Sequence, residues 1–471
     1  MISDSDSTLP TADSPVLPSK VVNGPKPLEW KAESVAVLEQ TLNLMYKQLL
    51  ESKDFSPSQC MVKISKILYE KKMYVNARDW MKMAADDSKD PVFQYEFYKL
   101  QNITGGDTLE SIEYLSESAK KGYLLACYYH GLCYENGVQD SEGKKLIDIN
   151  VVKALEIYKT VGRNTTNETP IYKLQHPKSQ YRISMILKNG YGGAEVDEEE
   201  SLKWAYRSAV QGFGDAAFSI GLRMVNSLMT TNGSISTSPT ESEMDVLLDG
   251  FNFMQYGADR GLEKYNAEIF EKTILPQFQR LYGSYLMADK ALVKTTANLP
   301  RFLLPEVENV GLELYRACNL LRFGSLTSVD TYAPTFAVAA AYECSDGAYE
   351  YARHLEYHRG KWCKLTEKVA MKKAIPFYWD AAKRGHVLGL MGLGDAFVID
   401  EPYQTAAYMI LTKGITEPTV VDLICKLEPP NMGDVEKFLE LEKHDYRKQF
   451  EAHTEKATVT EIQSSKCCVI Q

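Results

Sequence analysis

The residues with the most specific chemical pattern are the final four, Cys468, Val469, Ile470 and Gln471. A cysteine followed by two aliphatic residues and a permissive last residue is the pattern that protein prenyltransferases modify, and a final Gln favours farnesyl over geranylgeranyl. The thiol would become a thioether, the last three residues would be removed, and the new carboxylate would be methylated. The sequence therefore predicts that farnesyltransferase modifies Cys468, with Val469, Ile470 and Gln471 as the processing signal.

A second anchoring signal is needed because one isoprenoid chain binds a membrane only reversibly. The tail carries little positive charge around Lys466, so it lacks a polybasic signal, but Cys467 lies beside Cys468 and is a candidate for palmitoylation. A membrane protein partner is an equal alternative source of the remaining affinity. Both alternatives predict a protein that is lipid-anchored on the cytoplasmic face of the plasma membrane, and cytoplasmic when unmodified.

Two groups of residues have spacings that would suit metal binding, but a structural role fits them better. Cys127, His130 and Cys133 follow one another at intervals of three, yet they lie among Tyr and Leu residues, where Cys behaves as a small apolar side chain. His354 and His358 are four residues apart, but no Glu directly follows the first, as a zinc protease helix requires. We therefore expect no metal site, and a solvated or capping role for the second pair.

The sequence contains no recognisable catalytic motif. Residues 190–193 are rich in Gly but no Lys-Ser/Thr pair follows them, so we expect a turn and not a phosphate-binding loop. Neither a nucleophile elbow nor the set of kinase motifs occurs. The prediction is a protein that is not an enzyme, with no catalytic residue and no cofactor.

The composition is that of a folded, acidic protein. The 471 residues are 44% hydrophobic and 25% charged, an ordinary balance for globular domains. The formal net charge of −10 repels nucleic acid and anionic lipid, so neither is an expected partner of the folded body. The N-terminus shows no secretory pattern, and no apolar run reaches the roughly 18 residues of a membrane span. We expect the cysteines to be reduced.

Composition and periodicity divide the chain into five segments. Residues 1–28 are rich in Ser, Asp, Thr and Pro and are predicted to be disordered. Residues 29–426 carry apolar positions every three to four residues, the period of helices, with short Gly-bearing breaks. A Pro-containing linker at 427–433, a charged helix at 434–452 and a flexible tail at 453–471 with the prenylation pattern follow.

A repeated pattern of small residues indicates how these helices stack. Residues 119–122, 209–212 and 382–385 each run from an Ala to a Gly, and further small residues follow at offsets of seven and twelve. The Gly is a natural left-handed helix stop, and small residues on the next helix let two antiparallel helices approach closely. One such hairpin cannot bury both of its faces, so copies must stack. The predicted fold is an all-α solenoid of stacked antiparallel helical hairpins, with polar insertions at 160–178 and 227–243.

This pattern resembles the Sel-like repeat family, a relative of the tetratricopeptide repeat. Residues 131–138 match the middle of that repeat, and residues 152–158 and 373–382 match the Lys-Ala-Tyr run that follows it. Because it combines this repeat with a farnesylation pattern, the chain is similar to the fungal chitin synthase regulatory factors. That resemblance implies a non-catalytic adaptor or activator that binds an integral-membrane chitin synthase at the bud neck or division septum, in cell-wall or septum synthesis.

Two alternatives remain. One is a prenylated signalling adaptor of the cell-wall integrity pathway, which involves Rho and protein kinase C, and the other is a prenylated enzyme with a helical fold. Co-purification with a kinase or small GTPase would favour the first, and substrate turnover by the purified protein would favour the second. We prefer an adaptor because solenoids mostly bind other proteins and rarely catalyse reactions.

Overall fold

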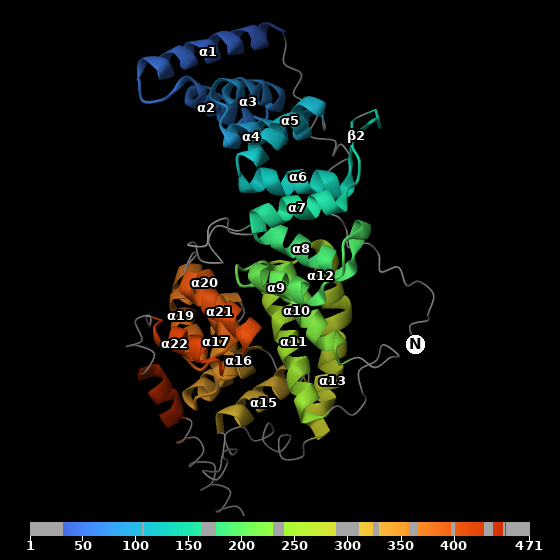
Figure 1. Cartoon of the computed structure of the whole chain (residues 1–471). Coiled ribbons are helices and arrows are strands. Elements are labelled where there is room, and N and C mark those ends of the chain that lie inside the picture. The colour runs from blue at the N-terminus through green and yellow to red at the C-terminus, as the bar shows by residue number, and fades with distance from the viewer. Residues whose placement is uncertain are drawn as a thin grey trace, which may run out of the picture. The chain divides into compact units, whose positions relative to one another are not determined.

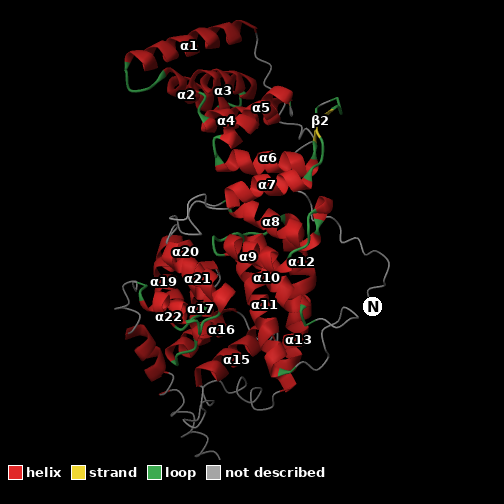
Figure 2. Cartoon of the chain, in the orientation of Figure 1, coloured by secondary structure: helices red, strands yellow, loops and turns green. Residues whose placement is uncertain are grey.

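The computed structural model describes most of the chain. The described residues are 32–105, 108–140, 142–162, 176–228, 240–288, 310–323, 329–357, 366–396, 401–427, 437–445 and 448. Their regular structure is helical apart from one small two-stranded sheet, so the all-α prediction is confirmed (Figure 2). The chain divides into two compact units, Met1–Trp204 and Ala205–Gln471.

The first unit is a succession of helices in which neighbours along the chain pack on one another (Figure 1). Its helices are α1 (Ala32–Glu51), α2 (Pro57–Glu70), α3 (Tyr74–Ser88), α4 (Pro91–Gly105), α5 (Leu109–Lys120), α6 (Leu124–Asn136), α7 (Val151–Gly162), α8 (Pro177–Asn189), the short 3₁₀ turn η1 (Tyr191–Gly193) and the start of α9 (Glu198–Ala209). Strands β1 (Val138–Gln139) and β2 (Lys145–Ile147) pair antiparallel after α6. Strands this short show no alternation in the sequence, and they were not predicted.

The second unit continues the same succession. Its helices are α10 (Gly214–Asn226), α11 (Glu241–Arg260), α12 (Lys264–Ile269), the π-helical turn η2 (Phe270–Ile274), α13 (Leu275–Ala288), α15 (Val310–Phe323), α16 (Val329–Ala341), α17 (Ser345–Tyr357), α19 (Glu367–Lys383), α20 (Val387–Ala396), α21 (Glu401–Lys413) and α22 (Pro418–Cys425). Neighbours again pack on one another, from α15 on α16 to α21 on α22. Both units therefore have the sequential packing of a helical solenoid.

Polar side chains determine where several helices begin. Ser56 precedes α2, and its hydroxyl accepts a hydrogen bond from the Gln59 N–H at 3.3 Å while the Gln59 side chain accepts one from the Ser56 N–H at 2.9 Å. Thr240 and Glu243 make the same reciprocal pair at the start of α11. Each such cap satisfies two backbone donors and contributes about 1 kcal/mol.

The predicted repeat turns end helices at the expected positions. Gly122, Gly212 and Gly385 have φ angles of +81°, +81° and +86°. In each turn the Gly N–H donates to the carbonyl of the Ala three residues earlier, with N···O distances of 2.9, 2.9 and 2.8 Å. A side chain with a Cβ atom is strained in this conformation, so Gly is the residue that reverses the chain here. The repeat register predicted for these turns is confirmed.

Two helices of the second unit come close enough for their backbones to touch. A Cβ atom on Gly221 of α10 would lie 2.2 Å from the Gly250 carbonyl oxygen of α11, and one on Gly257 of α11 would lie 2.4 Å from the Gly214 carbonyl oxygen of α10. Helices pack at this separation only where side chains are absent. We call these four residues the glycine seam.

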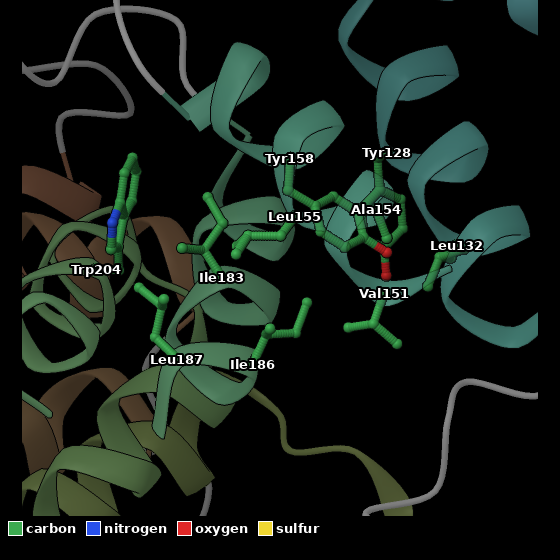
Figure 3. Packing of buried hydrophobic residues seen from close by; sticks show 10 residues of the cluster. All are labelled: Tyr128, Leu132, Val151, Ala154, Leu155, Tyr158, Ile183, Ile186, Leu187 and Trp204. Carbon is green, nitrogen blue, oxygen red and sulfur yellow. The ribbon is translucent and has the colours of Figure 1, made fainter. Parts of the chain in front are cut away.

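Large aromatic and aliphatic side chains fill the space between helices. In the first unit, α6 to α9 enclose a cluster in which Tyr158, Ile183 and Trp204 are fully buried (Figure 3). The Tyr158 hydroxyl donates to Glu135 Oε2 at 2.8 Å, and Trp204 Nε1 donates to Glu200 Oε1 at 2.8 Å. The polar ends of these rings are therefore satisfied while their apolar faces are buried.

The C-terminal end of the second unit includes a further helical stretch. Residues 437–445 are helical and lie inside the segment 434–452. Phe438 stacks on Tyr351 of α17 with 6.1 Å between ring centroids, and lies edge-on to Phe377 of α19 at 5.8 Å. This stretch therefore packs on the solenoid through an aromatic side chain.

Other predicted segments lie wholly or largely outside the described residues. These are the N-terminal segment 1–28, the linker 427–433 and the tail 453–471. The centres of both predicted insertions, 163–175 and 229–239, also lie outside. The predicted bounds of the insertions were too wide, because residues 160–162 belong to α7, residues 177–178 to α8 and residues 241–243 to α11. Over the part of the chain that the structure does describe, no helix combines the length and the hydropathy needed to cross a bilayer.

Candidate functional site

The residues predicted to carry and specify the lipid lie outside the described part of the chain. They are Cys467, Cys468, Val469, Ile470 and Gln471. Farnesylation of Cys468 and palmitoylation of Cys467 therefore stay predictions from the sequence.

The three residues of α6 that have metal-ligand spacing face different neighbours. The Cys127 thiol donates to the Ala119 carbonyl oxygen at 3.3 Å, whereas the Cys133 sulfur lies 3.9 Å from the Tyr98 hydroxyl. Burial, helped by nearby lysine charges, lowers the pKa of His130 to about 4, so its ring is neutral at pH 7. Among the described residues, no group of three or more His, Cys, Asp or Glu side chains is arranged to hold a metal ion.

The expectation that His354 is solvated or caps a helix is wrong. Its side chain is fully buried, its Nδ1 donates to the Glu350 carbonyl oxygen at 2.7 Å, and its ring lies 5.5 Å from that of Phe336. The physical reason is that α17 is enclosed on every side, with residues 347–355 all buried. A helix in this position buries polar residues that would be solvated on an ordinary amphipathic helix. His358 lies outside the described residues.

The Gly-rich segment after α8 is a turn, as predicted. Gly190 ends α8 with φ +65°, and Gly192 follows with φ +60°. A Cβ atom on Gly192 would lie 2.5 Å from the Val151 side chain at the start of α7, so this turn lies directly against its neighbour. Its glycines serve the packing of the repeat.

The second unit buries a network of charges where α11, α15 and α17 meet. Arg353 Nη1 lies 2.8 Å from Asp259 Oδ2, and Arg353 Nε lies 3.1 Å from Glu350 Oε2, which also pairs with Arg322 Nη1 at 3.2 Å. None of these four side chains is more than 10% exposed. Burial opposes the charges, but the paired arginines outweigh it and hold the pKa of Glu350 well below its usual range. Removal of any one of the four side chains would leave a buried charge without full compensation and would destabilise the second unit.

A second buried pair joins α11 to α20. Arg260 pairs with Asp395, which also accepts a hydrogen bond from the Tyr256 hydroxyl at 2.5 Å. The Arg260 guanidinium lies 3.4 Å from the centroid of the Tyr256 ring, within cation–π distance. The two networks connect α11 to residues 94 to 139 positions later in the chain. They join α11 to α17 and to α20.

Acidic side chains gather near these networks. Asp245 and Asp249 on α11, Asp346 on α17 and His386 just before α20 form what we call the acidic cluster. The Gly389 N–H donates to His386 Nδ1 at 3.1 Å, so the hydrogen of the neutral ring is on Nε2, which lies 3.3 Å from Asp346 Oδ1. His386 thus caps α20 with one nitrogen and holds Asp346 with the other.

The two central carboxyl groups of the cluster differ in their affinity for protons. Asp249 is exposed, yet surrounding atoms desolvate it and the Asp346 charge repels it, which together raise its pKa to about 6. Burial alone would raise the pKa of Asp346, but the hydrogen bond from His386 outweighs burial and lowers it. At neutral pH the cluster therefore carries negative charge on the exposed Asp249 as well as on Asp346.

Sequence analysis did not identify the acidic cluster. Its members come from α11, α17 and the residue before α20, and they span residues 245 to 386; the intervening repeats are too degenerate to place them on one face. The indirect signal was the Gly at 385, which ends α19 and thereby places His386 at the start of α20.

No protein-family model matches the sequence, and no curated protein matches it. Among solved structures, the chain is similar to a Sel1 repeat protein from Oxalobacter formigenes, with 14% identity, 53% of this chain and 91% of that chain covered, and a TM-score of 0.35. It is also similar to a protective antigen of uropathogenic Escherichia coli strains that displays an SLR fold, with 16% identity, coverages of 80% and 72%, and a TM-score of 0.32. The solenoid architecture assigned above rests on the helix order and packing of the chain itself.

Proposed function

We propose that this chain is a Sel-like repeat protein that acts as a non-catalytic scaffold for protein partners. The observation that carries the proposal is the sequential packing of helices in both units, on a framework held in the second unit by buried ion pairs. Solenoids use their concave surfaces to bind other proteins. A rigid framework also reduces the ordering cost of association.

The proposal includes a membrane tether. A farnesyl group on Cys468 would hold the scaffold at the cytoplasmic face of a membrane, and this confinement raises the effective concentration of a weak binder near a membrane partner. The sequence resemblance to fungal chitin synthase regulatory factors supports an integral-membrane chitin synthase as that partner. In this proposal the protein activates or positions the synthase during cell-wall or septum synthesis.

The tether is tested by replacing Cys468 with Ser in cells and measuring the membrane-bound fraction. We expect the variant to move to the soluble fraction, and mass spectrometry to find a farnesylated, methylated C-terminal cysteine only in the wild type. Cys425→Ser is the matched control, because Cys425 is an exposed free cysteine on α22. An unmodified terminal peptide in wild-type cells would refute the tether without touching the scaffold proposal.

The partner is tested by affinity purification of the full chain from detergent-solubilised membranes. Enrichment of a multi-spanning synthase would support the chitin synthase proposal. Enrichment of a kinase or small GTPase would replace it with the signalling adaptor. Recovery of no protein partner after chemical crosslinking, together with substrate turnover by the pure protein, would overturn the scaffold proposal itself.

A further inference from the structure

A groove lies on the first unit where α2, α3 and α4 meet. Its volume is about 190 Å³, and it is partly open to solvent. Its floor is apolar, because Met81 of α3 and Leu100 of α4 line it and are only 3% and 2% exposed. Both side chains belong to a hydrophobic core cluster that also includes Leu68 of α2, so packing holds the floor in place.

One wall of the groove is an aromatic ring that solvent can reach. Tyr69 of α2 lines the groove and is 43% exposed. Its ring lies edge-on to that of Tyr74 of α3, with 5.2 Å between the ring centroids. A side chain that entered the groove would contact this ring and the apolar floor together, and would remove apolar surface of both from water.

The rim of the groove carries four charged side chains, and two of them pair with each other. On α4, Lys99 Nζ lies 2.7 Å from Glu96 Oε2. On α2, Lys66 and Glu70 are exposed and make no ion pair or hydrogen bond with another of the described residues. They are four residues apart, which is about 6 Å along the helix axis. The α2 side of the rim therefore offers a cation and an anion one helical turn apart.

The size of the groove favours a single side chain as its occupant. An apolar cavity of about 150 Å³ accepts benzene, so this groove has room for one aromatic or large aliphatic side chain. Pockets that enclose small-molecule ligands usually have volumes of about 300–1,000 Å³. One anchoring side chain in a pocket, surrounded by weaker polar contacts, is the usual arrangement at the centre of a protein–protein interface.

We propose that this groove binds one face of an amphipathic helix supplied by a protein partner. A large apolar side chain of that helix would fill the space between Tyr69, Met81 and Leu100. Beside it, a carboxylate would lie opposite Lys66 and a cation opposite Glu70. An acidic and a basic residue four positions apart, with the apolar residue three positions after the first, share one face of a helix. This inference rests on the proposed scaffold function and specifies the chemistry of the partner.

The test is selection of a random library of helical peptides on the immobilised full chain. We expect the selected peptides to combine a large apolar residue with an acidic and a basic residue one turn apart. Fluorescence anisotropy of labelled peptides gives the dissociation constants. Tyr69→Ala should weaken binding about 10-fold because it removes the aromatic wall, and replacing the apolar anchor of the peptide by Ala should weaken binding by a similar factor.

An exchange of charges on α2 assigns the binding to the groove. The double variant Lys66→Glu, Glu70→Lys keeps the net charge but places like charges opposite the peptide, so binding should weaken about 10-fold. A peptide with its own acidic and basic residues exchanged should bind this variant better than it binds the wild type. The matched control exchanges two exposed charges between β1 and β2, Glu142→Lys with Lys144→Glu, and should bind as wild type does. Circular dichroism melts establish that each variant is folded.

The results that would overturn this inference differ from those that would overturn the scaffold. The groove would be excluded as a helix site if the library gave no binding peptide, or if the selected peptides lacked this pattern. Affinities that neither Tyr69→Ala nor the charge exchange changes would exclude it as well. If the charge-exchanged variant still recovers the wild-type partners in the affinity purification, the scaffold proposal stands without the groove.

Discussion

The two units of the chain bury charge in different ways. In the first unit, Arg182 of α8 pairs with Glu135 of α6, which lies 47 residues earlier in the chain. The Tyr158 hydroxyl donates a hydrogen bond to the same carboxylate. In the second unit, Arg353 and Arg260 form ion pairs with partners 94 and 135 residues away. The first unit is thus held by contacts between near neighbours, whereas the second also depends on contacts between helices remote in sequence.

This difference indicates two ways of using one repeat. A stack with only near-neighbour contacts gains stability in small, nearly independent steps. In a unit whose remote helices are joined by ion pairs, the positions of those helices are fixed relative to one another, because each pair is stable only when both helices are in place. We therefore expect the second unit to be the more cooperative.

The largest expected effect comes from removing the arginine that bridges two carboxylates. Arg353→Met removes the cationic partner of the buried Asp259, which keeps only the Gln255 amide at 3.0 Å, and weakens the neutralisation of Glu350. The unfolding free energy should therefore fall by about 3–5 kcal/mol. The matched change in the first unit is Arg182→Met, where Glu135 keeps the Tyr158 hydroxyl, and we expect about 1.5–3 kcal/mol. Urea unfolding followed by circular dichroism measures both.

Arg78→Met is the surface control for this pair of changes. The Arg78 partner, Asp79, is 58% exposed, so the expected loss is below about 0.5 kcal/mol. Equal losses for the Arg353 and Arg182 variants would show that the remote ion pairs add nothing to the second unit, and the proposed contrast between the units would be abandoned.

A smaller effect is expected at equivalent repeat turns. Gly122 and Gly212 share a φ of +81°, but a Cβ atom on Gly122 meets nothing within 4 Å, whereas one on Gly212 would lie 2.7 Å from Asp395 Oδ1. Gly122→Ala should cost about 1–2 kcal/mol, the strain of the left-handed conformation. Gly212→Ala should cost about 1–3 kcal/mol more, because it displaces the partner of Arg260.

A double-mutant cycle sharpens this comparison. In an Asp395→Ser background, Gly212→Ala should cost no more than Gly122→Ala, since the obstructing carboxylate is gone. Gly385→Ala provides an intermediate case: the added atom meets the end of the Ile415 side chain, which is 41% exposed and can move away. If all three glycines gave the same loss in every background, the turns would be equivalent in both units.

The smallest expected effect concerns pH. The pKa of Asp249 is about 6 in the folded chain, above the ordinary value of 3.8, so the folded state binds this proton more tightly than the unfolded state. Wild-type stability should therefore rise relative to Asp249→Asn as the pH falls from 7.5 through 6 toward 4. At pH 7.5 the Asn variant should melt higher by less than about 2 °C, because solvent screens an exposed carboxylate.

The same melts at pH 4.5 complete this test. There the wild-type carboxyl is protonated, and the two melting temperatures should coincide. Asp422→Asn, an exposed change on α22, should show no such convergence. A constant difference between wild type and Asp249→Asn across the pH range would mean that Asp249 is not desolvated in the folded chain.

Sequence reasoning was most successful where the signal is local. The Ala-to-Gly spacing placed three helix ends correctly, because a left-handed turn is determined by the residues within it. The buried position of His354 was not predictable in this way, since it depends on how completely other helices enclose α17. The ion pairs of Arg260 and Arg353 were missed for the same reason: spacing along the chain says nothing about which remote helices meet.

The glycine seam between α10 and α11 has a consequence for how this sequence can change. Gly214, Gly221, Gly250 and Gly257 already carry the smallest side chain available, and each faces the opposite backbone. Every substitution at these positions adds volume, so any mutation there increases the distance between α10 and α11. We therefore expect few neutral substitutions at the four positions of the seam.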